Sequence, residues 1–171
     1  AMAVAQKGTT GNFTTDTDMP TDRWNVNING AGTHDASLST DVPTGEGFAN
    51  SLRIQCTSAH GGIGSSGYIR LQQKIEEQYT VPTAYGTSGA KDMVMSFWIK
   101  FVNASGDFCV DILNLGNSNN RVISKKFTYA SGSGWQQYSF VIPGDTGGNS
   151  FRNAQVGTGL YWQIFLGAGT D

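Results

Sequence analysis

The sequence has few charged residues and no long apolar run, and both scarcities exclude classes of partner. Of its 171 residues, 14% are charged and the formal net charge is -2, so it lacks the basic surface typical of nucleic-acid-binding proteins. No apolar run approaches the roughly 20 residues that span a bilayer, and the N-terminus lacks the pattern of a signal peptide. We therefore expect binding to neither nucleic acid nor the membrane interior.

Residues that hold metals are also scarce. The two histidines, His34 and His60, lie in polar or glycine-rich stretches that we expect to be loops, so no site built on histidines is indicated. Asp16, Asp18 and Asp22 offer oxygen ligands that suit Ca²⁺, but they lack the spacing of an EF-hand loop. A solvated acidic loop is the favoured interpretation, with a structural calcium ion as the alternative. We expect no other cofactor.

Carboxylates are too few and too scattered to indicate catalysis. Glycoside hydrolysis needs two acids at a defined separation across a cleft. Glu76 and Glu77 are adjacent, and we expect both to be solvated, while Asp107 and Asp111 flank one strand without an evident partner. We therefore predict that the protein is not an enzyme.

Two cysteines, Cys56 and Cys109, both fall in strand-like segments. Free cysteine behaves as a small hydrophobic residue, so buried free thiols are the favoured interpretation. A disulfide is the alternative.

Glycine is abundant, and it divides the chain into short apolar pieces. The 23 glycines, with frequent serine, threonine and asparagine, are typical of many strands joined by turns. Apolar residues alternate with a period near two in the pieces that we predict as strands. These are 22–28, 51–56, 67–75, 92–102, 107–115, 121–129, 135–142 and 159–167. Residues 71–79 also fit a short helix, which would then be a turn after its strand.

Seven or more short antiparallel strands at this spacing indicate two packed sheets. We predict an all-β, two-sheet antiparallel β-sandwich of jelly-roll type that forms a single domain over residues 1–171. Trp24 and Trp135 each begin a strand after a polar loop, where a large ring can close the end of a sandwich.

Alternate positions in these strands separate a core face from an outward face. The predicted core residues are large and apolar: Leu52, Ile54, Ile69, Leu71, Met95, Phe97, Ile99, Phe101, Phe108, Val110, Ile112, Tyr138, Phe140, Ile142, Leu160, Trp162, Ile164 and Leu166. Burial of such a set can offset much of the entropy lost on folding.

The opposite positions mix aromatic rings with hydrogen-bonding groups, whereas an ordinary solvated face carries threonine, lysine and glutamate. They are Tyr68, Arg70, Gln72, Ser96, Trp98, Lys100, Asp111, Tyr161, Gln163 and Phe165. Aromatic planes stack on sugar rings, and arginine, glutamine and aspartate exchange hydrogen bonds with hydroxyls. A glycan-binding surface is one interpretation. The other is that these rings lie under a loop or against a neighbouring subunit.

The chain also resembles a domain of tail-fibre-like and other virion-associated proteins of tailed bacteriophages, especially marine ones. The likeness is carried by MAVAQKGT, DRWN, DVPTGEGFANSLRIQCT, QQKIEEQ, GTSGAKDMVMSFWIKF, NNRVISKKFTYASGSGWQQYSFVIPGDTGG and GLYWQIFLGAGTD. More distantly, the SFWIK and WQQYSFVIP segments look like strands of carbohydrate-binding-module jelly rolls.

This resemblance implies a virion location and contact with the host surface. It implies that the domain is part of a longer fibre or appendage protein, with other virion proteins as partners and a homo-oligomer such as a trimer in the fibre. The resemblance does not by itself assign a ligand; a cell-surface carbohydrate is expected from the aromatic and polar residues of the outward face. The resemblance also implies a further strand after FLGAGTD, so the sandwich would lack its last strand within the sequence and expose a sheet edge. The alternative function is purely structural, with the aromatic face packed against other subunits.

Overall fold

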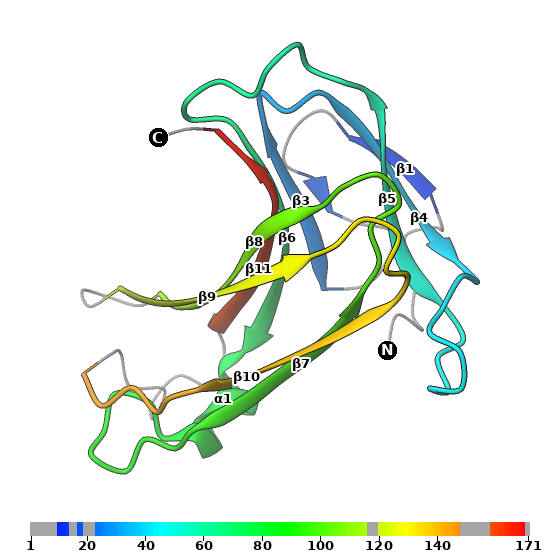
Figure 1. Ribbon diagram of the computed structural model, residues 1–171. Helices are drawn as coiled ribbons and strands as arrows, with labels where there is room; N and C mark the ends of the chain where they lie inside the picture. Colours follow the sequence, from blue (N-terminus) through cyan, green and yellow to red (C-terminus); the bar gives the residue numbers. More distant parts are fainter. Residues whose placement is uncertain (1–9, 14–16, 19–22, 116–119, 148–157, 170–171) are drawn as a thin grey trace. The chain divides into compact units, whose positions relative to one another are not determined.

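A computed structural model (Figure 1) describes residues 10–13, 17–18, 23–115, 120–147 and 158–169. The described part is all-β apart from two short helical turns, as predicted. Its elements are β1 (Thr10–Phe13), β2 (Thr17–Asp18), β3 (Trp24–Asn29), β4 (Thr33–Ser39), β5 (Ser51–Ser58), β6 (Tyr68–Glu76), α1 (Glu77–Thr80), η1 (Val81–Thr83), β7 (Met93–Ile99), β8 (Gly106–Asn114), β9 (Arg121–Tyr129), β10 (Gln136–Ile142) and β11 (Thr158–Ala168).

The chain forms two compact units. Unit 1 comprises residues 1–72 and 164–171, and unit 2 comprises residues 73–163. The boundaries fall inside β6 and β11, so each of these strands contributes one part to each unit. The single domain over 1–171 stays a prediction, and the units are described separately.

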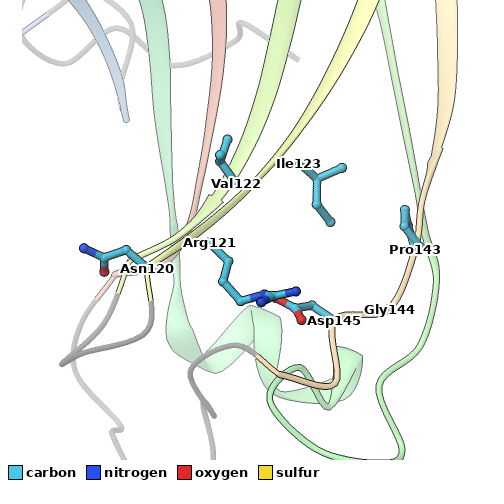
Figure 2. A pocket seen from close by; sticks show the side chains of 7 residues that line it. All are labelled: Asn120, Arg121, Val122, Ile123, Pro143, Gly144 and Asp145. Carbon is cyan, nitrogen blue, oxygen red and sulfur yellow. The ribbon is translucent and has the colours of Figure 1, made fainter.

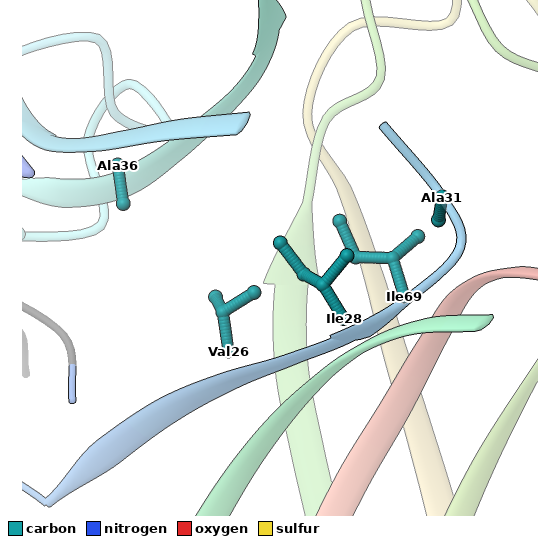
Figure 3. Packing of buried hydrophobic residues seen from close by; sticks show 5 residues of the cluster. All are labelled: Val26, Ile28, Ala31, Ala36 and Ile69. Atoms are coloured by element: carbon teal, nitrogen blue, oxygen red, sulfur yellow. The ribbon is translucent and has the colours of Figure 1, made fainter. Parts of the chain in front are cut away.

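Unit 1 contains two sheets with apolar side chains between them. One sheet has the order β1-β4-β5, with antiparallel pairs, and in the other β2, β3, β6 and β11 follow one another. Val26 and Ile28 of β3 and Ile69 of β6 form a cluster with Ala36 of β4 (Figure 3). Leu52, Ile54, Leu71 and Leu166 pack against this cluster, as the alternating pattern predicts, and Trp24 packs there too.

Strand β4 is absent from the predicted strands, because its sequence THDASLS has little of the expected apolar alternation. Its inward positions hold His34, Ala36 and Leu38, and the first two are buried. His34 therefore lies in a strand rather than a loop, and desolvation lowers its pKa. His60 does lie in an exposed loop, with its ring nitrogen Nδ1 against the carbonyl of Gly62.

Unit 2 has an aromatic core between two sheets. Strands β7 and β10 pair with each other, while β6, β11, β8 and β9 follow one another in the second sheet. The Phe97 ring of β7 lies edge-on to Phe127 of β9 and Trp162 of β11, at centroid distances of 5.5 and 5.8 Å. Such offset and edge-to-face contacts add to the free energy gained by burying apolar area. Phe97 and Trp162 therefore point inward, as predicted.

Several smaller predictions can be compared with the described residues. The segment 71–79 is strand β6 followed by the short helix α1, as the alternative for it proposed. Glu77 is buried, so its predicted solvation is wrong. Cys56 and Cys109 are both free, but Cys56 is exposed, which contradicts a buried thiol there. No described helix is long and apolar enough to cross a membrane.

Candidate functional site

The outward-facing residues predicted as one binding surface fall into three separate groups. The first belongs to unit 1 and the other two to unit 2. The third group lies apart from the second because β7, which carries Trp98, pairs with β10 and lies in a different sheet from β6, β8 and β11. The alternation correctly placed Phe97 in the core and Trp98 on the other side of β7. This strand parity, the assignment of alternate residues to the two faces of a strand, does not say which sheet the strand joins.

The first group, the Tyr68 cluster, consists of Asn27, Tyr68, Arg70 and Phe165 in unit 1. The guanidinium carbon of Arg70 lies 4.8 Å from the centroid of the Tyr68 ring, and the Phe165 ring stands edge-on to Tyr68 at 6.4 Å. Arg70 also donates a hydrogen bond from Nε to Oδ1 of Asn27 over 3.3 Å. Since the guanidinium covers one face of the tyrosine, these groups are engaged mainly with one another. Gln72, predicted for the same surface, is buried in this unit.

The second group, the β8–β11 face, consists of Lys74, Asp111, Tyr161 and Gln163 in unit 2. Gln163 donates a hydrogen bond from Nε2 to Oδ2 of Asp111 over 3.1 Å, and the two residues are 3% and 7% exposed. The Cys109 thiol donates to Oδ1 of the same carboxylate over 3.2 Å. Tyr161 is half-buried, with the Lys74 ammonium 5.8 Å from its ring centroid.

A carboxylate so well buried on the outward side of a sheet is unusual, because burial of a charge costs free energy unless hydrogen bonds or an opposite charge compensate it. Asp111 has two donors and, among the described residues, no ion pair. Burial, together with this carboxylate as the acceptor, raises the pKa of the Cys109 thiol to about 11. The β8–β11 face therefore has a fixed, acceptor-rich floor beside an aromatic ring.

The third group, the β7–β10 face, consists of Val94, Ser96, Trp98, Gln137, Ser139 and Val141. Trp98 lies opposite Gln137 across the two strands, Ser96 opposite Ser139, and Val94 opposite Val141. Val94 and Val141 are 71% and 58% exposed. Since Phe97 and Trp162 both point inward, Trp98 and Tyr161 lie on opposite outer faces of unit 2. Lys100, just after β7, is half-buried.

The remaining candidates have less support. Asp16 and Asp22 lie outside the described residues, and Asp18 belongs to β2. Among the described residues, no three histidine, cysteine, aspartate or glutamate side chains gather as a metal site would require. Asp107 is exposed and pairs with Lys126 at 2.9 Å. Its pKa is lowered by hydrogen bonds from Thr128 and Lys126.

Unit 2 also contains an open hollow of about 460 Å³ that no sequence pattern indicated (Figure 2). It is lined by Asn120, Arg121, Val122, Ile123, Pro143, Gly144 and Asp145. Its charged members, Arg121 and Asp145, are separated by 24 residues, so no local pattern indicated that they meet. Lys74 and Gln137 were also absent from the predicted surface residues. Both lie at outward-facing positions of strands that were predicted, so the alternation of the sequence could have indicated them.

Comparisons with known proteins give a likeness of fold. No family model and no curated protein matches the chain. Among solved structures, the enzymatically active domain of tailspike protein 4 from bacteriophage CBA120 is similar with a TM-score of 0.52 and 13% sequence identity. The likeness covers 84% of this chain and 17% of the tailspike chain. The chain thus shares its fold with part of this tailspike domain, while the jelly-roll topology and the likeness to carbohydrate-binding modules stay predictions.

Proposed function

We propose that the chain is a non-catalytic, virion tail-associated domain that binds a carbohydrate of the host surface through the β8–β11 face. The observation that carries the proposal is the half-exposed Tyr161 ring beside the buried Asp111–Gln163 pair. The fold shared with part of a phage tailspike supports the virion location.

The chemistry of this face suits a saccharide. A sugar presents apolar C–H surfaces that stack on an aromatic ring, and hydroxyls that both donate and accept hydrogen bonds. Tyr161 offers the ring, and the Lys74 ammonium beside it donates. The buried Asp111–Gln163 pair links β8 to β11 below the ring, so the surface that carries Tyr161 is ordered before the ligand arrives. Because these side chains are already ordered, binding costs less conformational entropy.

Such a face binds weakly as a single copy, and display on an oligomeric virion appendage raises its avidity. A homo-oligomer such as a trimer, with other virion proteins as neighbours, is the expected setting. No cofactor is needed for this role. The proposed function assigns no cleavage, because the Asp111 carboxylate is engaged by an amide and a thiol, and Asp107 by Lys126 and Thr128.

The test is a glycan array probed with the domain fused to a multimerising scaffold. We expect the wild-type fusion to bind a defined set of bacterial surface glycans and the Tyr161→Ala fusion to lose them. A wild-type fusion that binds no glycan, or a variant that keeps the full set, would contradict the proposal. Incubation of the bound glycans with the protein tests the non-catalytic part, since the appearance of shorter chains would contradict it.

A second candidate function is structural, and the β7–β10 face favours it. Val94 and Val141 are register partners and both are exposed, with Trp98 further along the same face. Exposed apolar side chains beside an aromatic ring are typical of protein interfaces. We therefore expect this face to pack against another copy of the chain in the assembled appendage. Sedimentation of the wild type and of a Val94→Lys/Val141→Lys double variant tests it. A wild type that remains monomeric at high concentration would contradict it.

A further inference from the structure

The hollow at Arg121 contains a guanidinium that is held in place at one of its nitrogens. Nε of Arg121 lies 2.6 Å from Oδ2 of Asp145, and Figure 2 shows the arginine extended to meet the aspartate. The arginine side chain is 54% exposed and the aspartate side chain is 6% exposed. Within the described part of the chain, no other nitrogen of this guanidinium makes a hydrogen bond, so the four N–H groups of Nη1 and Nη2 have capacity left.

The aspartate that holds the guanidinium is itself fixed by the backbone. Its Oδ1 accepts a hydrogen bond from the amide of Gly147 over 3.0 Å, and its carbonyl accepts one from the amide of Gly86 over 2.7 Å. Since Asp145 is anchored in this way, Arg121 loses part of its rotamer freedom when the protein folds. Binding of a ligand to Nη1 and Nη2 of Arg121 therefore costs less side-chain entropy.

The shape and chemistry of the open edge select a carboxylate. Two parallel N–H groups of a guanidinium match the two oxygens of a carboxylate, in a bidentate pair that a neutral hydroxyl cannot form. Ile123 and Pro143 add apolar lining beside the charge. We propose that the Arg121 hollow binds the carboxylate of an acidic saccharide, such as a uronic acid, with the guanidinium as anchor and the apolar lining against the sugar ring.

Nearby acidic groups limit the strength of this site. Asp145 neutralises much of the arginine charge, and Asp92 accepts a hydrogen bond from the Gly144 amide over 2.8 Å at the same loop. The expected selectivity therefore comes from bidentate geometry more than from net positive charge. The choice of a saccharide rests on the proposed function, whereas the carboxylate preference rests on Arg121 itself.

The test is an NMR titration of the isotope-labelled protein with glucuronate, glucose and acetate, followed through the Nε–H signal of Arg121 and the amides of residues 120–123 and 144–145. We expect glucuronate to shift these signals saturably, and glucose to leave them unchanged. We expect acetate to bind roughly tenfold more weakly than glucuronate. The absence of a glucuronate shift, or equal shifts with glucose, would overturn the proposal. Acetate binding as tight as glucuronate would overturn its saccharide part.

Three variants test whether the Arg121 guanidinium itself holds the carboxylate. Arg121→Lys keeps the positive charge but removes the two parallel N–H groups of the guanidinium. Glucuronate binding should therefore weaken roughly tenfold, the loss expected for a charge-assisted hydrogen bond. Arg53→Gln, which changes an exposed arginine of unit 1, should bind normally. Tyr161→Ala should also keep the hollow intact, so failure of the proposed glycan face and failure of this site are distinguishable. Glucuronate binding of wild-type strength in Arg121→Lys, or its loss in Arg53→Gln, would contradict the assignment.

Discussion

The amide of Gln163 donates to the carboxylate of Asp111 over 3.1 Å, and neither side chain points into the aromatic core of unit 2. Both are nevertheless buried, although the strand pattern places them on the outward side of their sheet. A polar pair in that position costs free energy of desolvation, which the hydrogen bond offsets in part. The pair, the aromatic core of unit 2 and the ionisable groups Cys109 and Tyr85 can each be tested by substitution.

Removal of the amide should destabilise the fold measurably. In Gln163→Leu the Asp111 carboxylate keeps the Cys109 thiol as its donor, and loses its stronger partner. We expect the free energy of unfolding to fall by about 1–3 kcal/mol, the cost of leaving a buried polar group unsatisfied. Urea denaturation measures it. The control Gln137→Leu changes an exposed glutamine and should remain within about 0.5 kcal/mol of the wild type. Equal effects of the two substitutions would contradict the account.

The aromatic core gives a test of strand parity in β7. Phe97 contacts the rings of Phe127, Tyr138, Phe140 and Trp162. Phe97→Ala should therefore lower the free energy of unfolding by about 3 kcal/mol through lost burial and a residual cavity. Val94→Ala, three residues earlier and exposed, should change it by less than about 0.5 kcal/mol. A larger effect at Val94 than at Phe97 would show that β7 faces the other way.

The two thiols should differ in reactivity. Burial, assisted by the Asp111 carboxylate, raises the pKa of Cys109 from 9.0 to about 11, so at neutral pH it carries about 100-fold less thiolate than a thiol of ordinary pKa. Cys56 is exposed. We expect one thiol to react rapidly with a disulfide reagent near pH 8 and the other only on unfolding. In Cys56→Ser the rapid phase should disappear, and its persistence would contradict the assignment.

Stability at alkaline pH should depend on Tyr85. Its hydroxyl donates to the carbonyl of Pro143 over 3.0 Å. Burial, with Asp145 and Asp92 nearby, raises its pKa from 10.0 to about 12. Because the folded state holds the proton more tightly, this stabilisation is complete below pH 10 and is lost as the pH rises from about 10 to 12.

The loss amounts to roughly 2–3 kcal/mol by linkage. Tyr85→Phe should be less stable at neutral pH, because it leaves a carbonyl without its donor, and its unfolding free energy should fall less between pH 10 and 12. Lysines and the other tyrosines titrate in both proteins, so their contribution drops out when the unfolding free energy of Tyr85→Phe is subtracted from that of the wild type. A difference that stays constant with pH would contradict the shift.

Local patterns in the sequence predicted much of the fold. Strand β9 begins and ends where the alternation of residues 121–129 placed it, and Phe97 and Trp162 point inward as parity required. Strand β4 was not predicted, because His34 and Ala36 occupy inward positions that usually hold large apolar residues. A strand can therefore be predicted from the alternation of apolar and polar residues along the chain when its inward residues are large and apolar.

The candidate site was less predictable, because it depends on which strands become neighbours. Parity placed Trp98 and Tyr161 outside the core, but the pairing of β7 with β10 puts them on opposite faces of unit 2. Likewise, the burial of Asp111 depends on strand β11, more than 45 residues away in the sequence. The ion pair of Arg121 with Asp145 joins a strand to a loop, and no local signal marks it.

The measurement that tests the glycan-binding face most directly is a pair of calorimetric titrations with the best array ligand. One uses Tyr161→Ala and the other Trp98→Ala, which truncates an aromatic ring of the same unit on its opposite face. We expect Tyr161→Ala to weaken binding by at least about tenfold, as loss of an aromatic anchor usually does, and Trp98→Ala to bind within about twofold of the wild type. Strong binding by Tyr161→Ala with loss in Trp98→Ala would contradict it and place the saccharide on the β7–β10 face.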